Sequence, residues 1–262
     1  MHIFDPRFAP APHWRRKPPE ADVATYRRLQ QRIGTQRTVV VTPSTYGTDN
    51  ACTLDALERM GDSARGVAVV DADATRAELE RLASHRVCGL RVNFVSPQSW
   101  GTTTPAMLET LARKAQPLGW HIQVFAHPEQ LIAMAPLFAV LPTPLVIDHL
   151  GRIDPADGAS GPAFDVVRRL LDGGRTWIKL SGIYMRSTDG APGYRDTFPL
   201  GEALARHAPE RLVWGSDWPH TTETPGSVDD AALVDVLLAW CGTDETLRRV
   251  LVDNPAQLYG FA

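Results

Sequence analysis

Several features that would mark particular classes of protein are scarce in this sequence. Its 262 residues include three cysteines, Cys52, Cys88 and Cys241, which are too few and too scattered for a disulfide framework. We therefore expect reduced thiols and a cytoplasmic protein. No apolar run approaches the roughly 18–20 residues of a membrane-spanning helix, and the N-terminal residues do not resemble a secretory leader.

The chain also lacks a large excess of charge of either sign. The chain has 27 basic and 30 acidic residues, a formal net charge of −3, and no long block of either sign. Basic stripes are the usual footprint of nucleic-acid binding, and basic clusters attract anionic membranes. Neither a nucleic acid nor a membrane is therefore an expected partner. We expect a small-molecule substrate and a monomer or homodimer.

A repeating order of short apolar runs and helical patterns fills most of the chain. Uninterrupted β-branched runs that alternate with helices are typical of a parallel sheet covered by helices. No Gly-x-Gly-x-x-Gly follows the first run, which disfavours a doubly wound dinucleotide-binding sheet. With a stub at Ile3 and Phe4 the count is eight, so we predict α/β class and one (β/α)8 TIM-barrel domain over residues 1–262, its first strand incomplete. The other predicted strands are Thr38–Thr42, Gly66–Val70, Cys88–Phe94, His121–Phe125, Leu145–His149, Trp177–Ser181 and Leu212–Asp217.

The N-terminal stretch from Asp5 to Pro19 breaks this order. Its prolines exclude a helix, and the stretch also carries Arg15 and Arg16. Long loops in compact domains are often functional. It is either a basic lid over an anionic substrate or a solvated surface excursion.

Polar residues gather where the predicted strands end. Catalytic groups of such barrels lie at the C-terminal ends of the strands. His2, Arg91, His149 and Asp217 stand at four of these ends. They supply a base, imidazoles that polarise a carbonyl, and a cation for a carboxylate.

Each of these residues also has a structural explanation when it is considered alone. Asp217 fits a turn cap, and a strand-end histidine is commonly a hydrogen-bonded core residue. Lys179 fits a side chain that extends along apolar surface to water. Arg152 is followed by Asp154 and Asp157, either of which is an ion-pair partner. The shared position of the four polar residues at one end of the barrel favours a catalytic site.

Several motifs resemble one known family. They are His2-Ile3-Phe4-Asp5, Tyr46-Gly47-Thr48-Asp49-Asn50, Gly89-Leu90-Arg91-Val92-Asn93, Ile147-Asp148-His149-Leu150-Gly151-Arg152, Lys179-Leu180-Ser181-Gly182-Ile183-Tyr184, Trp214-Gly215-Ser216-Asp217-Trp218-Pro219-His220 and Asn254-Pro255-Ala256. Together they span the chain and resemble the amidohydrolase superfamily (amidohydrolase-related family 2), in the branch of the 2-pyrone-4,6-dicarboxylate lactonases. Members open with Asp-x-His-x-His, and His2 matches only the second histidine. The resemblance therefore implies that the first histidine and its strand lie upstream of Met1.

The resemblance implies hydrolysis of a lactone, a cyclic ester, that carries carboxylates. Asp217 is then the general base, and His149 and His2 polarise the carbonyl. Metal-dependent members use further histidines, but here Phe125, Lys179 and Ser181 end the corresponding strands. We therefore expect no metal and no other cofactor, with zinc as the alternative. The predicted substrate-binding residues are Arg91, Tyr46, Asn93, Lys179, Tyr184, Arg186 and His220.

Three other functions remain open at this point. A sugar lactonase would need fewer cationic contacts, and a decarboxylase of the same superfamily would need a bound ion. A barrel without its first strand would be catalytically impaired.

Overall fold

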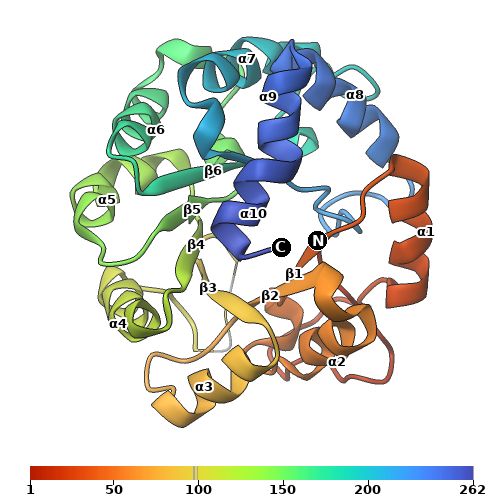
Figure 1. The fold of residues 1–262 in the computed structure, drawn as a ribbon, viewed down its shortest axis with the longest axis vertical. Helices are drawn as coiled ribbons and strands as arrows, with labels where there is room; N and C mark the ends of the chain where they lie inside the picture. Colours follow the sequence, from red (N-terminus) through yellow and green to blue (C-terminus); the bar gives the residue numbers. More distant parts are fainter. Residues whose placement is uncertain (97, 99, 262) are drawn as a thin grey trace.

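A parallel sheet of seven strands forms the centre of the computed structural model, which describes residues 1–96, 98 and 100–261. Neighbours in the chain are neighbours in the sheet, from β1 to β7 in order, and every pairing is parallel. Viewed down the strands, the sheet curls around an axis and the helices form an outer ring (Figure 1). The strands are β1 (Thr38–Val41), β2 (Ala64–Ala68), β3 (Val87–Asn93), β4 (His121–Phe125), β5 (Leu145–Ile147), β6 (Thr176–Leu180) and β7 (Leu212–Trp214).

The helices begin and end where local chemistry directs. The side chains of Asp22, Thr75 and Thr104 accept hydrogen bonds from the first turns of α1, α3 and α4, and Gly34 ends α1 in the left-handed conformation. The helices are α1 (Val23–Ile33), α2 (Ala51–Met60), α3 (Arg76–Ser84), α4 (Pro105–Ala115), α5 (Pro128–Val140), α6 (Pro162–Asp172), α7 (Phe198–His207), α8 (Asp230–Cys241), α9 (Asp244–Arg248) and α10 (Asn254–Tyr259). None of the described helices is long and apolar enough to cross a membrane.

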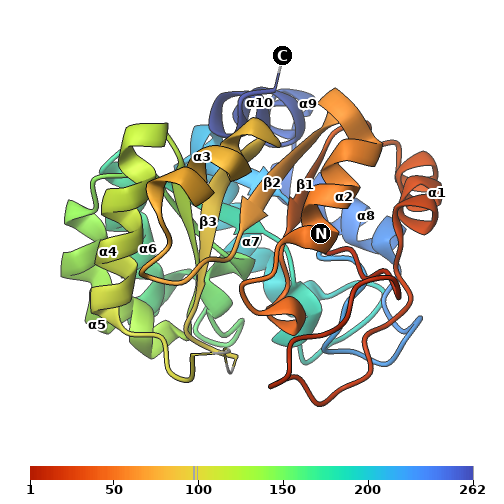
Figure 2. The same cartoon turned by 90° about the horizontal axis from the view of Figure 1, so that it is seen from below.

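The two ends of the curled sheet differ. Helix α10 lies across one end, while long loops, including the proline-rich stretch near the N-terminus, gather at the other (Figures 1 and 2). Tyr259 and Phe261, at and just after the end of α10, pack on the buried Val146, Trp177 and Val213. This apolar plug closes the N-terminal ends of the strands and leaves the opposite end for polar chemistry.

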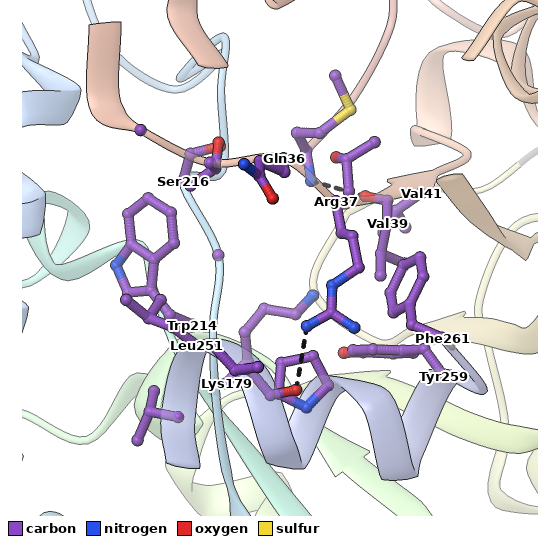
Figure 3. Close-up of a pocket in the computed structure, with 18 of the residues that line it drawn as sticks. Gln36, Arg37, Val39, Val41, Lys179, Trp214, Ser216, Leu251, Tyr259 and Phe261 are labelled. Atoms are coloured by element: carbon purple, nitrogen blue, oxygen red, sulfur yellow. Dashed lines mark hydrogen bonds between the residues drawn. The ribbon is translucent and has the colours of Figure 1, made fainter. Parts of the chain in front are cut away.

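The predicted stub at Ile3 and Phe4 is not a strand of this sheet. Phe4 forms an isolated antiparallel bridge with Ala21 instead. The residues just before it do enter the seam between β1 and β7: Met1 N donates to Val39 O, and His2 N donates to Trp218 O. The seam continues as a cavity of about 280 Å³, into which Arg37 and Lys179 extend (Figure 3).

The other seven strand predictions are correct to within three residues, but six of these strands end one to three residues early, and His121–Phe125 alone ends where it was predicted. β1 ends at Val41, β5 ends at Ile147 and β7 at Trp214, so His149 and Asp217 follow their strands rather than end them. His149 has φ 51° and Asp217 has φ 60°. These left-handed conformations are costly for residues with a side chain, and they turn both residues out of the strand direction.

Candidate active site

Asp217 lies between two imidazoles at the loop end of the sheet. Its Oδ1 is 3.8 Å from Nε2 of His2 and 3.8 Å from Nε2 of His149. Its Oδ2 accepts a hydrogen bond of 2.6 Å from the hydroxyl of Tyr184. The structure thus brings together all three predicted catalytic residues and one predicted substrate-binding residue.

The far nitrogens of the two imidazoles have different partners. Nδ1 of His2 lies 2.8 Å from the backbone oxygen of Val41, which can only accept, so Nδ1 carries the proton. Neutral His2 therefore presents a lone pair on Nε2 and cannot donate a hydrogen bond to a carbonyl oxygen there. This differs from the prediction that His2 polarises the carbonyl. Nδ1 of His149 lies 2.8 Å from Oγ of Ser181, whose hydroxyl can donate. His149 can therefore carry its proton on Nε2.

Burial sets the protonation of this group. It lowers the pKa of His2 to about 3 and also lowers the pKa of His149. Burial alone would raise the pKa of Asp217, but the two histidines and the Tyr184 hydrogen bond outweigh it and hold that pKa at about 2. At neutral pH the site therefore holds an ionised carboxylate and two neutral imidazoles.

A second carboxylate, Asp148, lies beneath these residues and is 2% exposed. It accepts hydrogen bonds from Lys179 Nζ at 2.6 Å and from Gln123 Nε2 at 3.0 Å, and Nε of Arg91 lies 3.7 Å away. Burial would raise the pKa of Asp148, but the charge of Lys179, that of His149 once it is protonated at low pH, and that of Arg91 keep it below its usual value. Asp148 thereby places two predicted substrate-binding residues, Lys179 and Arg91, beside the histidines.

The ring of Phe125 links the histidines to two arginines. It packs edge-on against His149 with 5.1 Å between ring centroids. The guanidinium carbon of Arg91 lies 5.5 Å from the Phe125 centroid, and that of Arg152 lies 5.2 Å from it. Two cations therefore flank the aromatic ring that touches a predicted catalytic histidine.

The remaining predicted site residues lie further from Asp217 or serve the fold. Tyr46 is buried against Phe4, and Asn93 donates to Ser44 and accepts two backbone hydrogen bonds that shape its own loop. Nε2 of His220 bonds to Asp230, while its ring contacts Tyr184. Arg186 forms an ion pair with Asp154.

The sequence and the fold of this chain are similar to those of known proteins. The model of the amidohydrolase family matches residues 1–261. The chain belongs to the amidohydrolase family. A 4-sulfomuconolactone hydrolase of Rhizobium radiobacter is 35% identical, over 99% of this chain and 88% of that protein. A 2-pyrone-4,6-dicarboxylate hydrolase of Comamonas testosteroni is 33% identical, over 98% of this chain and 88% of that protein.

A solved structure has the same architecture. It is a probable 2-pyrone-4,6-dicarboxylic acid hydrolase of Acinetobacter baumannii with citric acid bound, and it is 26% identical with a TM-score of 0.84. The alignment covers 99% of this chain and 97% of that one. The curled parallel sheet with surrounding helices is therefore the amidohydrolase barrel architecture, of which seven strands are formed here.

Some residues of this amidohydrolase site were not predicted. Ser181 shares a hydrogen bond with Nδ1 of His149, Asp148 accepts a hydrogen bond from Lys179, and Phe125 packs against His149. Their position at the strand ends was a signal in the sequence that could have identified them as site residues. Their contacts could not be predicted, because a carboxylate, a hydroxyl or a ring has many structural uses.

The described side chains at this site do not form a metal-binding group. In the described part of the chain, no group of three or more His, Cys, Asp or Glu side chains is arranged to hold a metal ion. Arg91 and Lys179 line the same small cavity as His2, His149 and Asp217. A divalent cation there would meet two fixed positive charges. This donor set does not fit the zinc-type site of a metal-dependent amidohydrolase.

Proposed function

We propose that this protein is a hydrolase that opens the ring of a small carboxylated lactone, similar to 2-pyrone-4,6-dicarboxylate. The observation that carries the proposal is an ionised Asp217 held between two neutral imidazoles with cations alongside. The hydrolase names of the two curated relatives support the same chemistry. The neighbour with citric acid bound supports a carboxylated ligand.

Asp217 is the general base in this proposal. Tyr184 occupies Oδ2, which leaves Oδ1 to accept a proton from water. The lone pair on Nε2 of His2 accepts the second hydrogen of that water and so orients the oxygen toward the substrate. This role differs from carbonyl polarisation, and it follows from the hydrogen bond to Val41.

His149 is the electrophile. With Ser181 donating to Nδ1, its Nε2–H donates to the lactone carbonyl oxygen and stabilises the oxyanion that forms on attack. When the tetrahedral intermediate collapses, the ring carbon–oxygen bond breaks. The proton on Asp217 passes to the leaving ring oxygen, and the product carries a hydroxyl and a new carboxylic acid, which loses its proton to solvent. Arg91 and Lys179 hold a substrate carboxylate nearby.

We propose that this reaction needs no resident metal. The unsuitable donor set and the two cations at the site support this. Turnover that persists after dialysis against a chelator is the expected result, and loss of turnover that zinc restores would contradict it.

The first two residues lie in the seam between β1 and β7. We propose that Met1 and His2 occupy the place of an eighth barrel strand there. Met1 N donates to Val39 O and Met1 O accepts from Val41 N, which is the pattern of parallel pairing, while His2 N donates to Trp218 O on the other side.

The function is tested with the Asp217→Asn variant and a panel of lactones. Asn tolerates the left-handed backbone at this position, so the fold is retained. We expect turnover to fall about 10²- to 10⁴-fold. Asp71→Asn is the matched control, because Asp71 lies just beyond β2 but is exposed. Near wild-type turnover of Asp217→Asn would overturn the assignment of the base.

A further inference from the structure

The side chain of His220 is anchored to the start of helix α8. Its Nε2 lies 3.1 Å from Oδ2 of Asp230, the first residue of α8, and the two side chains are 8% and 6% exposed. A carboxylate accepts hydrogen bonds, so Nε2 of His220 is the donor. The other ring nitrogen, Nδ1, has no hydrogen bond among the described residues. The bond to Asp230 is therefore the polar contact that fixes the orientation of this buried ring.

The ring of His220 supports Tyr184 in turn. The two rings meet edge-on, with 5.1 Å between their centroids and 89° between their planes. Tyr184 lies in a single short turn, Ile183–Met185, which gives it little support from its own element. Its hydroxyl donates the 2.6 Å hydrogen bond to Oδ2 of Asp217. A perpendicular contact against the phenol ring limits its movement, and with it the position of the hydroxyl that holds the proposed base.

The backbone closes these contacts into a ring. His220 N donates to Asp217 O at 3.0 Å, and both residues have φ 60°. A left-handed conformation is unfavourable for residues with a side chain, so it persists where the surroundings hold it. Tyr184, after β6, holds the side chain of Asp217, and Asp230, on α8, holds that of His220. The turn that carries the base is thus fixed from two different elements.

We propose that Asp230 is a positioning residue for the reaction, because it fixes the ring of His220 and thereby keeps the Tyr184 hydroxyl on Asp217. This inference rests on the proposed function, in which Asp217 is the general base. Without the Asp230 carboxylate the buried N–H of His220 loses its acceptor, which is unfavourable. Rotation of the imidazole toward another acceptor relieves that penalty, and the rotated ring no longer supports Tyr184.

The negative charge of Asp230 is a separate influence on Tyr184. Burial, the charge of Asp217 and the hydrogen bond to it, and the charges of Glu223 and Asp230 all raise the pKa of Tyr184, with burial as the largest cause. The hydroxyl therefore stays protonated even without the charge of Asp230. Asp230→Asn separates the two influences, because it removes the charge and keeps an oxygen that accepts from His220.

The hydroxyl of Tyr184 can be followed without turnover. The chain has five tyrosines, so a ¹³C label at Cζ gives a simple NMR spectrum, in which Tyr184→Phe identifies the Tyr184 signal. We expect Asp230→Ala to shift this signal toward that of a tyrosine bonded to water, and Asp230→Asn to leave it close to the wild-type position. An unmoved signal in Asp230→Ala, or equal shifts in the Ala and Asn variants, would overturn the positioning role.

Two further variants guard this experiment against a general loss of structure. His220→Asn tolerates the left-handed backbone and removes the ring contact, so it should shift the Tyr184 signal and serves if Asp230→Ala folds poorly. Asp229→Ala is the matched control. Asp229 caps α8 through Ala231 N and pairs with Arg32, but its side chain is 52% exposed. Its loss should lower stability and leave the signal in place. An equal shift in Asp229→Ala, or none in His220→Asn, would contradict the proposal.

Kinetics test whether Asp230 acts through Tyr184. Asp230→Ala should lower kcat about 10-fold with KM nearly unchanged, because a displaced base affects the transition state more than substrate binding. In the Tyr184→Phe background the same substitution should lower kcat less than about twofold, since the hydroxyl is already absent. A full further loss in that background would show that Asp230 acts by another route. If the wild-type protein opens no lactone, the proposed function fails, whereas the NMR spectra still decide whether Asp230 positions Tyr184.

Discussion

The hydroxyl of Tyr184 donates a hydrogen bond of 2.6 Å to Oδ2 of Asp217, on the carboxylate oxygen that faces away from the histidines. This bond fixes the carboxylate plane and leaves Oδ1 for the water. It also stabilises the ionised form of Asp217. Both imidazoles are neutral near pH 7, whereas the Tyr184 hydrogen bond favours the ionised carboxylate there as well.

Replacement of Tyr184 by Phe should therefore raise the pKa of Asp217. The base is active when deprotonated, so the acidic limb of kcat/KM against pH should move to higher pH, with a smaller effect on the plateau. The measurement is a pH profile of lactone opening. Tyr194→Phe, at another buried tyrosine, is the control and should leave the limb in place. An unmoved limb in Tyr184→Phe would show that the hydrogen bond does not tune the base.

The order of strands and helices could be predicted from the sequence because parallel barrels have a simple pattern. Buried strands are continuous apolar runs, as in Val39-Val40-Val41, and each is followed by a helical pattern. The positions of His149 and Asp217 followed from that pattern. Their left-handed turns did not, because backbone strain at a functional residue has no counterpart in hydrophobic periodicity.

Roles that depend on a partner's chemistry could not be predicted. His2 and His149 are equivalent in the sequence, and only the atoms facing Nδ1, a backbone oxygen in one case and the Ser181 hydroxyl in the other, distinguish them. The partners in an ion pair likewise depend on positions in the fold and not on distance along the sequence. Asp154 is two residues from Arg152, yet it pairs with Arg186.

Loss of the Asp148 carboxylate should destabilise the protein. Asp148→Asn leaves Lys179, whose side chain is 12% exposed, without its counter-charge in the interior. Removal of one member of a buried pair typically costs about 3–5 kcal/mol of unfolding free energy. Urea unfolding at neutral pH measures the change. Asp172→Asn removes a carboxylate that is half exposed and lies 2.7 Å from His207 and 3.7 Å from Arg168, and it should cost about 0–1 kcal/mol. Equal effects of the two substitutions would contradict this ranking.

Stability should fall as the pH is lowered through the histidine range. His121 is fully buried, neither ring nitrogen has a hydrogen bond among the described residues, and burial lowers its pKa from 6.5 to about 3. Between those values the unfolded chain binds the proton and the folded protein does not, so the contribution of His121 to stability is present above pH 6.5 and is lost progressively as the pH falls toward pH 3. This residue alone should remove about 2 kcal/mol between pH 7.5 and pH 5.

The contribution of His121 is isolated by His121→Leu. Its unfolding free energy should depend less steeply on pH than that of the wild-type protein, whatever its stability at pH 7.5. Identical slopes for the two proteins between pH 7.5 and pH 5 would mean that His121 does not remain neutral in the fold.

Gly182 is the residue that allows His149 and Ser181 to meet. It has φ 63°, and a Cβ atom there would lie 2.7 Å from Nδ1 of His149, the nitrogen that Ser181 contacts. The same atom would lie 2.3 Å from the terminal carbon of Met185, which can move aside. Gly182→Ala should therefore displace the imidazole and lower kcat at least about 10-fold, in addition to the cost of about 1–2 kcal/mol for left-handed alanine.

The control for this substitution separates strain from collision. Gly190 has φ 68°, and a Cβ atom there would meet nothing within 4 Å. Gly190→Ala should therefore lose the same 1–2 kcal/mol of stability while keeping full kcat. Combination of Gly182→Ala with Met185→Ala removes the flexible neighbour but leaves the collision with His149, so kcat should stay low. Recovery of kcat in that double variant would assign the defect to Met185, and the position of His149 would then not depend on Gly182.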